Sequence, residues 1–185
     1  MSCFQIETVI KYVDHSSDFY IQIPELMYSN PLLLKERPFA EVAESILNDH
    51  YPSLFFHLNS MQSCLEYLKQ EYNATELYTA VQQIYQSVDQ LYRLEKIVIF
   101  PLFEKLEREQ RVTDKEAPLQ MVNHQEQRIE RLLEVALQSV NDIFINEDNN
   151  TCLHSFNSEL HAFKEEFDRI QEVKKSFYEI RFHEA

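Results

Sequence analysis

The chain contains one decisive stretch, Leu91-Tyr-Arg-Leu-Glu-Lys-Ile-Val-Ile-Phe-Pro-Leu-Phe-Glu-Lys-Leu106, which is strongly apolar but carries a carboxylate at Glu95. Residues on this stretch and before it are spaced alternately four and three apart, as on one face of an α-helix. They are Leu77, Val81, Ile84, Val88, Leu91, Glu95, Val98 and Leu102. Glu95 is therefore predicted to point inward. A buried carboxylate is costly unless it is paired, hydrogen-bonded or bound to a metal, so its partner is the route to function.

The same spacing predicts three further long helices. The first begins at Pro38 and ends near residue 72, with Ala43, Leu47, His50, Leu54, Leu58, Met61, Leu65 and Leu68 on its inner face. The third begins at Pro118, with Met121, Val122, Ile129, Leu132, Val135, Ala136 and Ile143. The fourth runs from about 152 to 182, with Phe156, Leu160, Phe163, Phe167, Ile170, Lys174 and Phe177. A second charge, that of Lys174, thus falls on an inner face.

Four amphipathic helices joined by short connections predict an all-α fold, an antiparallel up-down-up-down four-helix bundle over residues 38–185. Residues 1–37 are predicted to be an N-terminal helical extension, with a short helix over residues 4–14. Pro52 and Pro101 predict kinks within the first two long helices. Asn73-Ala-Thr-Glu76 resembles a capping box that starts the second helix.

Composition excludes several classes of function. The chain has 185 residues, no glycine and a formal net charge of -14. Phosphate-cradling loops depend on glycine, and a strongly acidic protein repels nucleic-acid backbones. A partner that is basic, or a small molecule, fits this charge better than a nucleic acid does.

Cysteine usage and hydropathy predict where the protein works. Cys3, Cys64 and Cys152 are odd in number and far apart, which is typical of reduced cytosolic thiols. Cys64 lies near the inner face of the first long helix and is interpreted as a small core residue. No stretch approaches the roughly 20 apolar residues that span a bilayer, so we expect a cytoplasmic protein without membrane contact.

Several motifs together resemble the hemerythrin-like, HHE cation-binding domain, and most closely the iron-sulfur cluster repair di-iron proteins. The resemblance covers roughly residues 40 to 182. It rests on Ile46-Leu-Asn-Asp-His-Tyr-Pro-Ser-Leu54, Leu94-Glu-Lys-Ile-Val-Ile-Phe-Pro101, Asn123-His-Gln-Glu126, Leu132-Leu-Glu-Val135 and the order of the helices. In that family each of the four helices provides a histidine, and the second and fourth each add a bridging carboxylate.

The resemblance implies a remnant metal site formed by His50, Glu95 and His124. His50 falls at or one residue before the ligand position of the first helix, and Tyr51 is the competing register. Glu95 matches the first bridging carboxylate, and His124 matches the histidine of the third helix. If a cofactor is bound, the resemblance implies non-haem iron.

Three family ligands are replaced in this chain. Leu91 and Ile170 stand where the family has histidines, and Lys174 stands where it has a carboxylate. The remaining donors are too few for a stable di-iron centre. We therefore expect no bound cofactor, and we expect the Lys174 ammonium to form a core ion pair with Glu95.

Three functions are consistent with these residues. The leading one is a hemerythrin-like protein with a decayed di-iron site, acting as a binding, regulatory or assembly module for a protein or small-molecule partner. The alternative is a non-haem iron protein for oxygen or nitric oxide sensing or iron-sulfur cluster repair. The third is a structural helical interaction protein, with a homodimer as one form of assembly. No catalytic residue is assigned, because one sequence shows no nucleophile-base-acid geometry.

Overall fold

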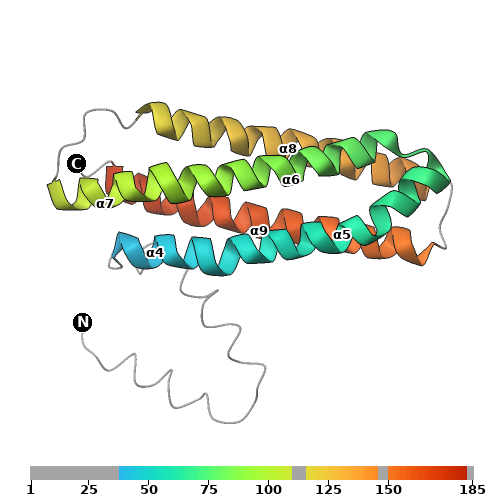
Figure 1. Cartoon of the computed structure of the whole chain (residues 1–185), viewed down its shortest axis with the longest axis horizontal. Helices are drawn as coiled ribbons and strands as arrows, with labels where there is room; N and C mark the ends of the chain where they lie inside the picture. The colour runs from blue at the N-terminus through green and yellow to red at the C-terminus, as the bar shows by residue number, and fades with distance from the viewer. Residues whose placement is uncertain (1–37, 110–115, 146–149, 183–185) are drawn as a thin grey trace, which may run out of the picture. The chain divides into compact units, whose positions relative to one another are not determined.

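The computed structural model describes residues 38–109, 116–145 and 150–182. These residues form helices and no strand, which confirms the all-helical prediction (Figure 1). The helices are α4 (Phe39–Ser45), η1 (Ile46–His50), α5 (Tyr51–Tyr72), α6 (Thr75–Leu94), η2 (Glu95–Ile99), α7 (Phe100–Glu109), α8 (Glu116–Phe144) and α9 (Thr151–Phe182). Residues 38–172 form one compact unit, and a second unit begins at Val173. The predicted extension over residues 1–37, with its helix at 4–14, lies outside the described residues.

Two π-helical turns, η1 and η2, interrupt the first two long helices where kinks were predicted. The N–H of Tyr51 donates to the carbonyl of Ile46, and the N–H of Phe100 donates to the carbonyl of Glu95, so both bonds span five residues. Each turn is followed by an aromatic residue and then a proline, Pro52 or Pro101. Proline has no N–H, and its ring clashes with the carbonyl four residues earlier. Widening the preceding turn removes that clash, and π-turns of this kind are frequent at functional sites.

The turn η2 shifts the inner face of the second long helix by one residue. Glu95 is fully buried, as predicted. Beyond it the predicted inner residue Val98 is 39% exposed, whereas Ile99 and Phe103 are buried. The prediction was wrong for Val98 because a π-turn holds one more residue than the α-helical spacing assumes.

Smaller corrections apply to the first and third helices, and the fourth agrees with the sequence pattern. Ile46 is buried where Leu47 was predicted, and both residues lie within the π-turn η1. On α8 the buried residues are Val122, Ile129, Leu133, Ala136 and Val140, whereas Met121, Leu132, Val135 and Ile143 are exposed or half-buried. The seven predicted inner residues of α9 are all buried. Apolar spacing is thus an accurate guide to burial in α9, whereas in α8, which is also a regular α-helix, it is not.

The helix ends depend on asparagine in a chain without glycine. Asn73 ends α5 with φ of 51°, the left-handed conformation that asparagine tolerates best after glycine. The capping box predicted there is wrong, because α6 begins at Thr75 after Ala74, which makes no side-chain cap. Asn150 caps α9, since its Oδ1 accepts from the N–H groups of Cys152 and Leu153.

Asn150 also ties the start of α9 to the end of α5. Its amide nitrogen donates to the hydroxyl oxygens of Tyr72 at 2.6 Å and Tyr67 at 3.1 Å. The oxygen of this side chain therefore accepts hydrogen bonds from the first turn of α9, while its nitrogen donates hydrogen bonds to α5.

Helix α6 packs along α8 and also contacts α5 (Figure 1). Small side chains are buried on both helices, Ala80 and Ser87 on α6 and Ala136 on α8. Small residues let two helix backbones approach closely, which explains the extensive contact between them.

Candidate functional site

The buried carboxylate of Glu95 has a direct hydrogen-bond partner. The hydroxyl of Tyr51 donates to Glu95 Oε2 at 2.8 Å, and both residues are buried. Tyr51 is the first residue of α5, directly after η1, and Glu95 is the first residue of η2. The two π-turns therefore position the two ends of this bond. Of the two registers left open by the sequence, it is Tyr51 whose side chain bonds Glu95.

The neighbouring residue, His50, is paired with a different carboxylate. His50 Nδ1 lies 2.6 Å from Glu166 Oε1, and both side chains are buried. The second oxygen of Glu166 accepts a 3.2 Å bond from the Arg169 guanidinium one turn further along α9. Glu166 therefore receives donors on both oxygens, which offsets part of the cost of burying it.

His50 and Glu166 begin a regular series of contacts between α5 and α9, which we call the α5–α9 column. Each step moves seven residues forward on one helix and seven residues back on the other. The pairs are His50 with Glu166, His57 with Glu159, and Cys64 with Cys152. In the second pair, His57 Nδ1 lies 2.7 Å from Glu159 Oε2, and both side chains are partly buried. Seven residues are close to two helical turns, so the three pairs lie in one line.

The Cys64–Cys152 pair closes the column near Asn150. Cys152 Sγ lies 3.9 Å from the carbonyl oxygen of Cys64, and both cysteines are free and half-buried. Burial raises the pKa of Cys152, and the hydrogen bond to the Cys64 side chain and its charge add to the shift. The two thiols thus influence each other directly.

The residues present do not fit a di-iron centre. His124 is exposed on α8, whereas Glu95 is fully buried and hydrogen-bonded to Tyr51. Leu91 and Ile170, at two family histidine positions, are buried apolar side chains. Across the described ranges no three His, Cys, Asp or Glu side chains converge as a metal site would need.

Lys174, at the remaining family position, is 2% exposed. Burial of a lysine requires compensation of its charge. The predicted ion pair between Lys174 and Glu95 stays a prediction.

Three further titratable side chains, on α9, have surface or structural roles. Asp168 pairs with Lys164 one turn earlier on α9. His154 packs edge-on against Phe144, with ring centroids 5.0 Å apart, and His161 is exposed.

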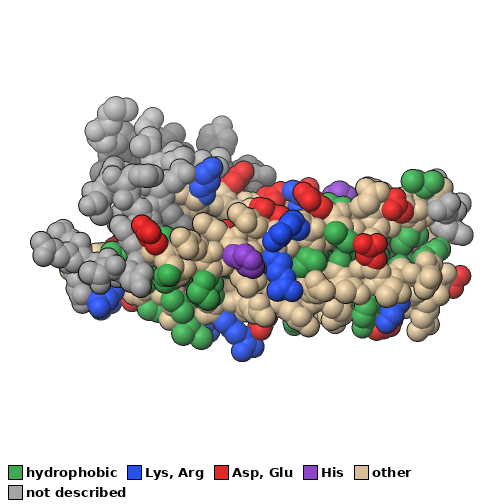
Figure 2. All heavy atoms as spheres, turned by 90° about the horizontal axis from the view of Figure 1, so that it is seen from above, with side chains coloured by type: hydrophobic (Ala, Val, Ile, Leu, Met, Phe, Trp, Pro, Cys, Tyr) green, Lys and Arg blue, Asp and Glu red, His purple; other side chains and the backbone are tan. Residues whose placement is uncertain are grey.

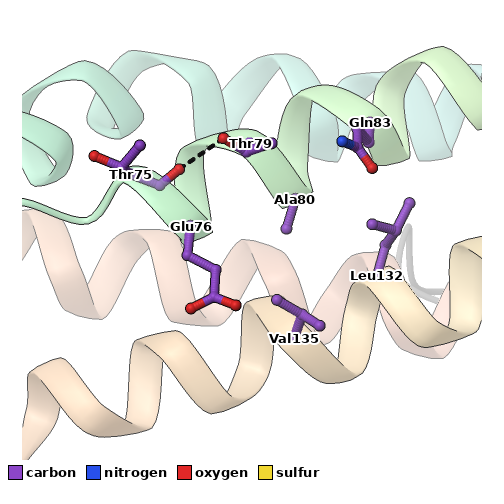
Figure 3. A pocket seen from close by; sticks show the side chains of 7 residues that line it. All are labelled: Thr75, Glu76, Thr79, Ala80, Gln83, Leu132 and Val135. Carbon is purple, nitrogen blue, oxygen red and sulfur yellow. Dashed lines mark hydrogen bonds between the residues drawn. The ribbon is translucent and has the colours of Figure 1, made fainter.

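A shallow hollow of about 430 Å³ lies between α6 and α8 (Figure 3). Its lining is mostly apolar or small: Thr75, Glu76, Thr79, Ala80, Gln83, Leu132 and Val135. The Thr79 hydroxyl is already used within α6, where it donates to the carbonyl oxygen of Thr75 at 2.8 Å. The lining contains none of the residues of the buried pairs.

Exposed apolar side chains gather where η2 meets α8. Ile97 is 70% exposed and Met121 is 58% exposed, and Val98 lies next to Ile97. The elements η2 and α8 are in contact, and Figure 2 shows apolar side chains gathered on the face where α8 begins. We call Ile97, Val98 and Met121 the η2 patch. Large exposed apolar side chains that cluster are typical of a contact surface.

Within the part of the chain that is described, no helix has both the length and the apolar character to cross a membrane. Comparisons with protein-family models, with curated proteins and with solved structures found no match. The resemblance to hemerythrin-like domains therefore stays a prediction from the motifs.

Glu166, Glu159 and the pairing of the two cysteines were not predicted from the sequence. A signal for them was present, because His50, His57 and Cys64 are spaced by seven, as are Cys152, Glu159 and Glu166. Spacing alone does not say which helices face each other or in what register.

Proposed function

We propose that this chain is a hemerythrin-like, antiparallel up-down-up-down four-helix bundle whose metal site is replaced by side-chain hydrogen bonds. It acts as a cytoplasmic binding, regulatory or assembly module and not as an enzyme. The observation that carries this proposal is the Tyr51–Glu95 bond, because it engages the carboxylate that the family uses to bridge two irons.

The antiparallel arrangement is supported by the order of the contacts. Residue numbers in the α5–α9 column rise along α5 while they fall along α9. Between α5 and α6 lie only Asn73 and Ala74, and so short a connection reverses the chain between neighbouring helices.

A protein partner is supported by the η2 patch and by the charge of the chain. Two copies of a protein with net charge -14 repel each other, whereas a basic partner is attracted. We infer that the patch docks a basic amphipathic helix of another protein, with apolar contacts at Ile97 and Met121.

Iron analysis tests the proposed loss of the metal site. Protein from iron-supplemented cells should carry well below one iron per chain and show no oxo-bridge absorption band. The matched variant restores the family donors through Leu91→His, Ile170→His and Lys174→Glu, and it should gain iron if the resemblance is correct. About two irons per wild-type chain would overturn the proposal in favour of a non-haem iron protein. A variant that folds but gains no iron would instead count against the family resemblance.

The docking surface is tested with an amphipathic helical peptide of leucine and lysine. Binding to wild type should be salt-dependent and should weaken at least about tenfold in Ile97→Glu/Met121→Glu. Phe56→Glu changes an exposed apolar side chain on α5 and serves as the control. Equal weakening in both variants would show that the peptide recognises only overall charge. Light scattering gives the mass of the free protein, and it therefore distinguishes docking of another protein from formation of a homodimer.

A further inference from the structure

Cys64 and Cys152 occupy the last pair of the α5–α9 column and come from helices in defined register. The His57–Glu159 pair lies two helical turns away, and Asn150 bonds Tyr67 and Tyr72 on the other side. The thiols are therefore held opposite each other by contacts that do not involve sulfur.

The printed contacts place the two cysteines next to each other. Cys152 Sγ is 3.9 Å from the carbonyl oxygen of Cys64, which is only a few bonds from Cys64 Sγ. The exposed Ser63 Oγ lies 3.9 Å from Cys64 Sγ, so this thiol also lies at the edge of the helix pair and not in the deep core. The side chain of Cys152 also forms a hydrogen bond with that of Cys64, and partial exposure of both cysteines admits a small oxidant.

We propose that Cys64 and Cys152 are a redox modification site that forms a reversible disulfide between α5 and α9. The oxidant is a low-molecular-weight disulfide of the glutathione class. In a cytosolic protein such a bond is transient and responds to redox conditions.

The exchange proceeds in two balanced steps. The Cys64 thiolate attacks one sulfur of glutathione disulfide, forms a mixed disulfide and releases one glutathione thiolate. Cys152 then loses its proton to solvent and attacks Cys64 Sγ, which releases the second glutathione thiolate. Two protein thiols are oxidised by two electrons, and one glutathione disulfide is reduced to two glutathione thiols.

The order of attack follows from the environment of Cys152. Burial and the neighbouring Cys64 side chain raise the pKa of Cys152, so its thiol stays protonated while Cys64 reacts first. Once Cys64 is in a mixed disulfide, it no longer carries charge. Its contribution to the shift then disappears, which lowers the pKa of Cys152 and favours the second step, while burial continues to raise that pKa.

The experiment measures this equilibrium on the full chain carrying Cys3→Ser. Protein is equilibrated with glutathione and glutathione disulfide, quenched with acid, and analysed by peptide mapping in a mass spectrometer. We expect an internal disulfide between Cys64 and Cys152. The bond closes a loop of 88 residues, and oxidation should raise the midpoint of thermal unfolding by about 10 °C.

A matched control moves one thiol by one position. Ser63→Cys with Cys64→Ser keeps the composition but turns the thiol about 100° around α5, onto an exposed position. The equilibrium constant for the internal disulfide should be at least about 100-fold larger in the parent protein than in this variant. Circular dichroism establishes that both proteins are equally helical.

Two outcomes would overturn the proposal. One is a parent protein whose cysteines carry only glutathione or link separate chains, with no internal bond. The other is an internal disulfide that forms equally well after the one-position move, because the folded register would then play no part.

Discussion

Tyr51 donates a 2.8 Å hydrogen bond to Glu95 in the protein interior, from the first residue after one π-turn to the first residue of the other. Replacing the tyrosine with phenylalanine keeps the ring and removes the donor. We expect Tyr51→Phe to lower the free energy of unfolding by about 1 to 3 kcal/mol, since it leaves a buried carboxylate with one bond fewer. Tyr92→Phe is the control because the Tyr92 hydroxyl accepts only an exposed bond from Lys96. The free energy of unfolding of both variants is measured by denaturant unfolding. Equal losses of stability in the two variants would contradict a special role for Tyr51.

Glu95 and Lys174 provide a second prediction, because both carry charge and both are buried. If they form an ion pair, Glu95→Leu or Lys174→Met alone should cost about 3 to 5 kcal/mol, since each leaves one charge uncompensated. The double variant should then be close to wild type. The free energies of unfolding of the three variants form a double-mutant cycle. Single costs that simply add would show that the two residues do not compensate each other.

The π-turn at η2 predicts that one residue can be removed there without changing which side chains are buried. The deletion of the exposed Ile97 is made in a protein that already carries Pro101→Ala. It should turn η2 into a regular α-helix and leave Ile99 and Phe103 inward. We expect the free energy of unfolding to stay within about 1 kcal/mol of Pro101→Ala itself.

The control for this deletion removes Gln86, which is exposed on the regular helix α6. That change rotates one half of the helix by about 100° relative to the other and displaces its core face. Stability should fall by more than about 4 kcal/mol, measured by the same thermal and denaturant unfolding. If both deletions changed the free energy of unfolding equally little, η2 would not determine which side chains of the second long helix face inward.

From the raised pKa of Cys152 we expect the free energy of unfolding to depend on pH in the alkaline range. Burial, with the hydrogen bond and charge of Cys64, raises the pKa of Cys152 from 9.0 to about 12. The folded protein therefore holds this proton more tightly than the unfolded chain does. The stabilisation is fully present below the unfolded pKa of 9.0 and is lost as the pH rises toward about 12.

This pH dependence is measured as the difference between reduced wild type and Cys152→Ser across that range. The difference removes other alkaline titrations, such as that of Tyr78, whose pKa is raised by its hydrogen bond to Glu66. If the free energies of unfolding of the two proteins changed with pH in parallel, the raised pKa of Cys152 would be refuted. Iodoacetamide labelling of Cys152 in the folded protein should likewise be slow at neutral pH and accelerate in strong alkali.

The positions of the helices and the core of α9 were determined by the sequence alone. Each of the seven inner positions that apolar spacing of three and four predicted on α9, from Phe156 to Phe177, is buried, because that helix is regular throughout its described length. Glu95 was also correctly predicted to be buried, since the spacing before it is regular. Local periodicity can be followed along a helix where each residue turns it by the same amount, although on α8 it did not select the buried residues correctly.

What lies beyond each irregular turn was decided only by the tertiary structure. The extra residue of η2 exposes Val98, and η1 brings Tyr51 to Glu95, neither of which a fixed period can represent. The pairings of Glu166 and of Cys152 depend on which helices face each other and in what register. Register is set by packing between segments about a hundred residues apart, so it is a property of the folded chain and not of any local stretch.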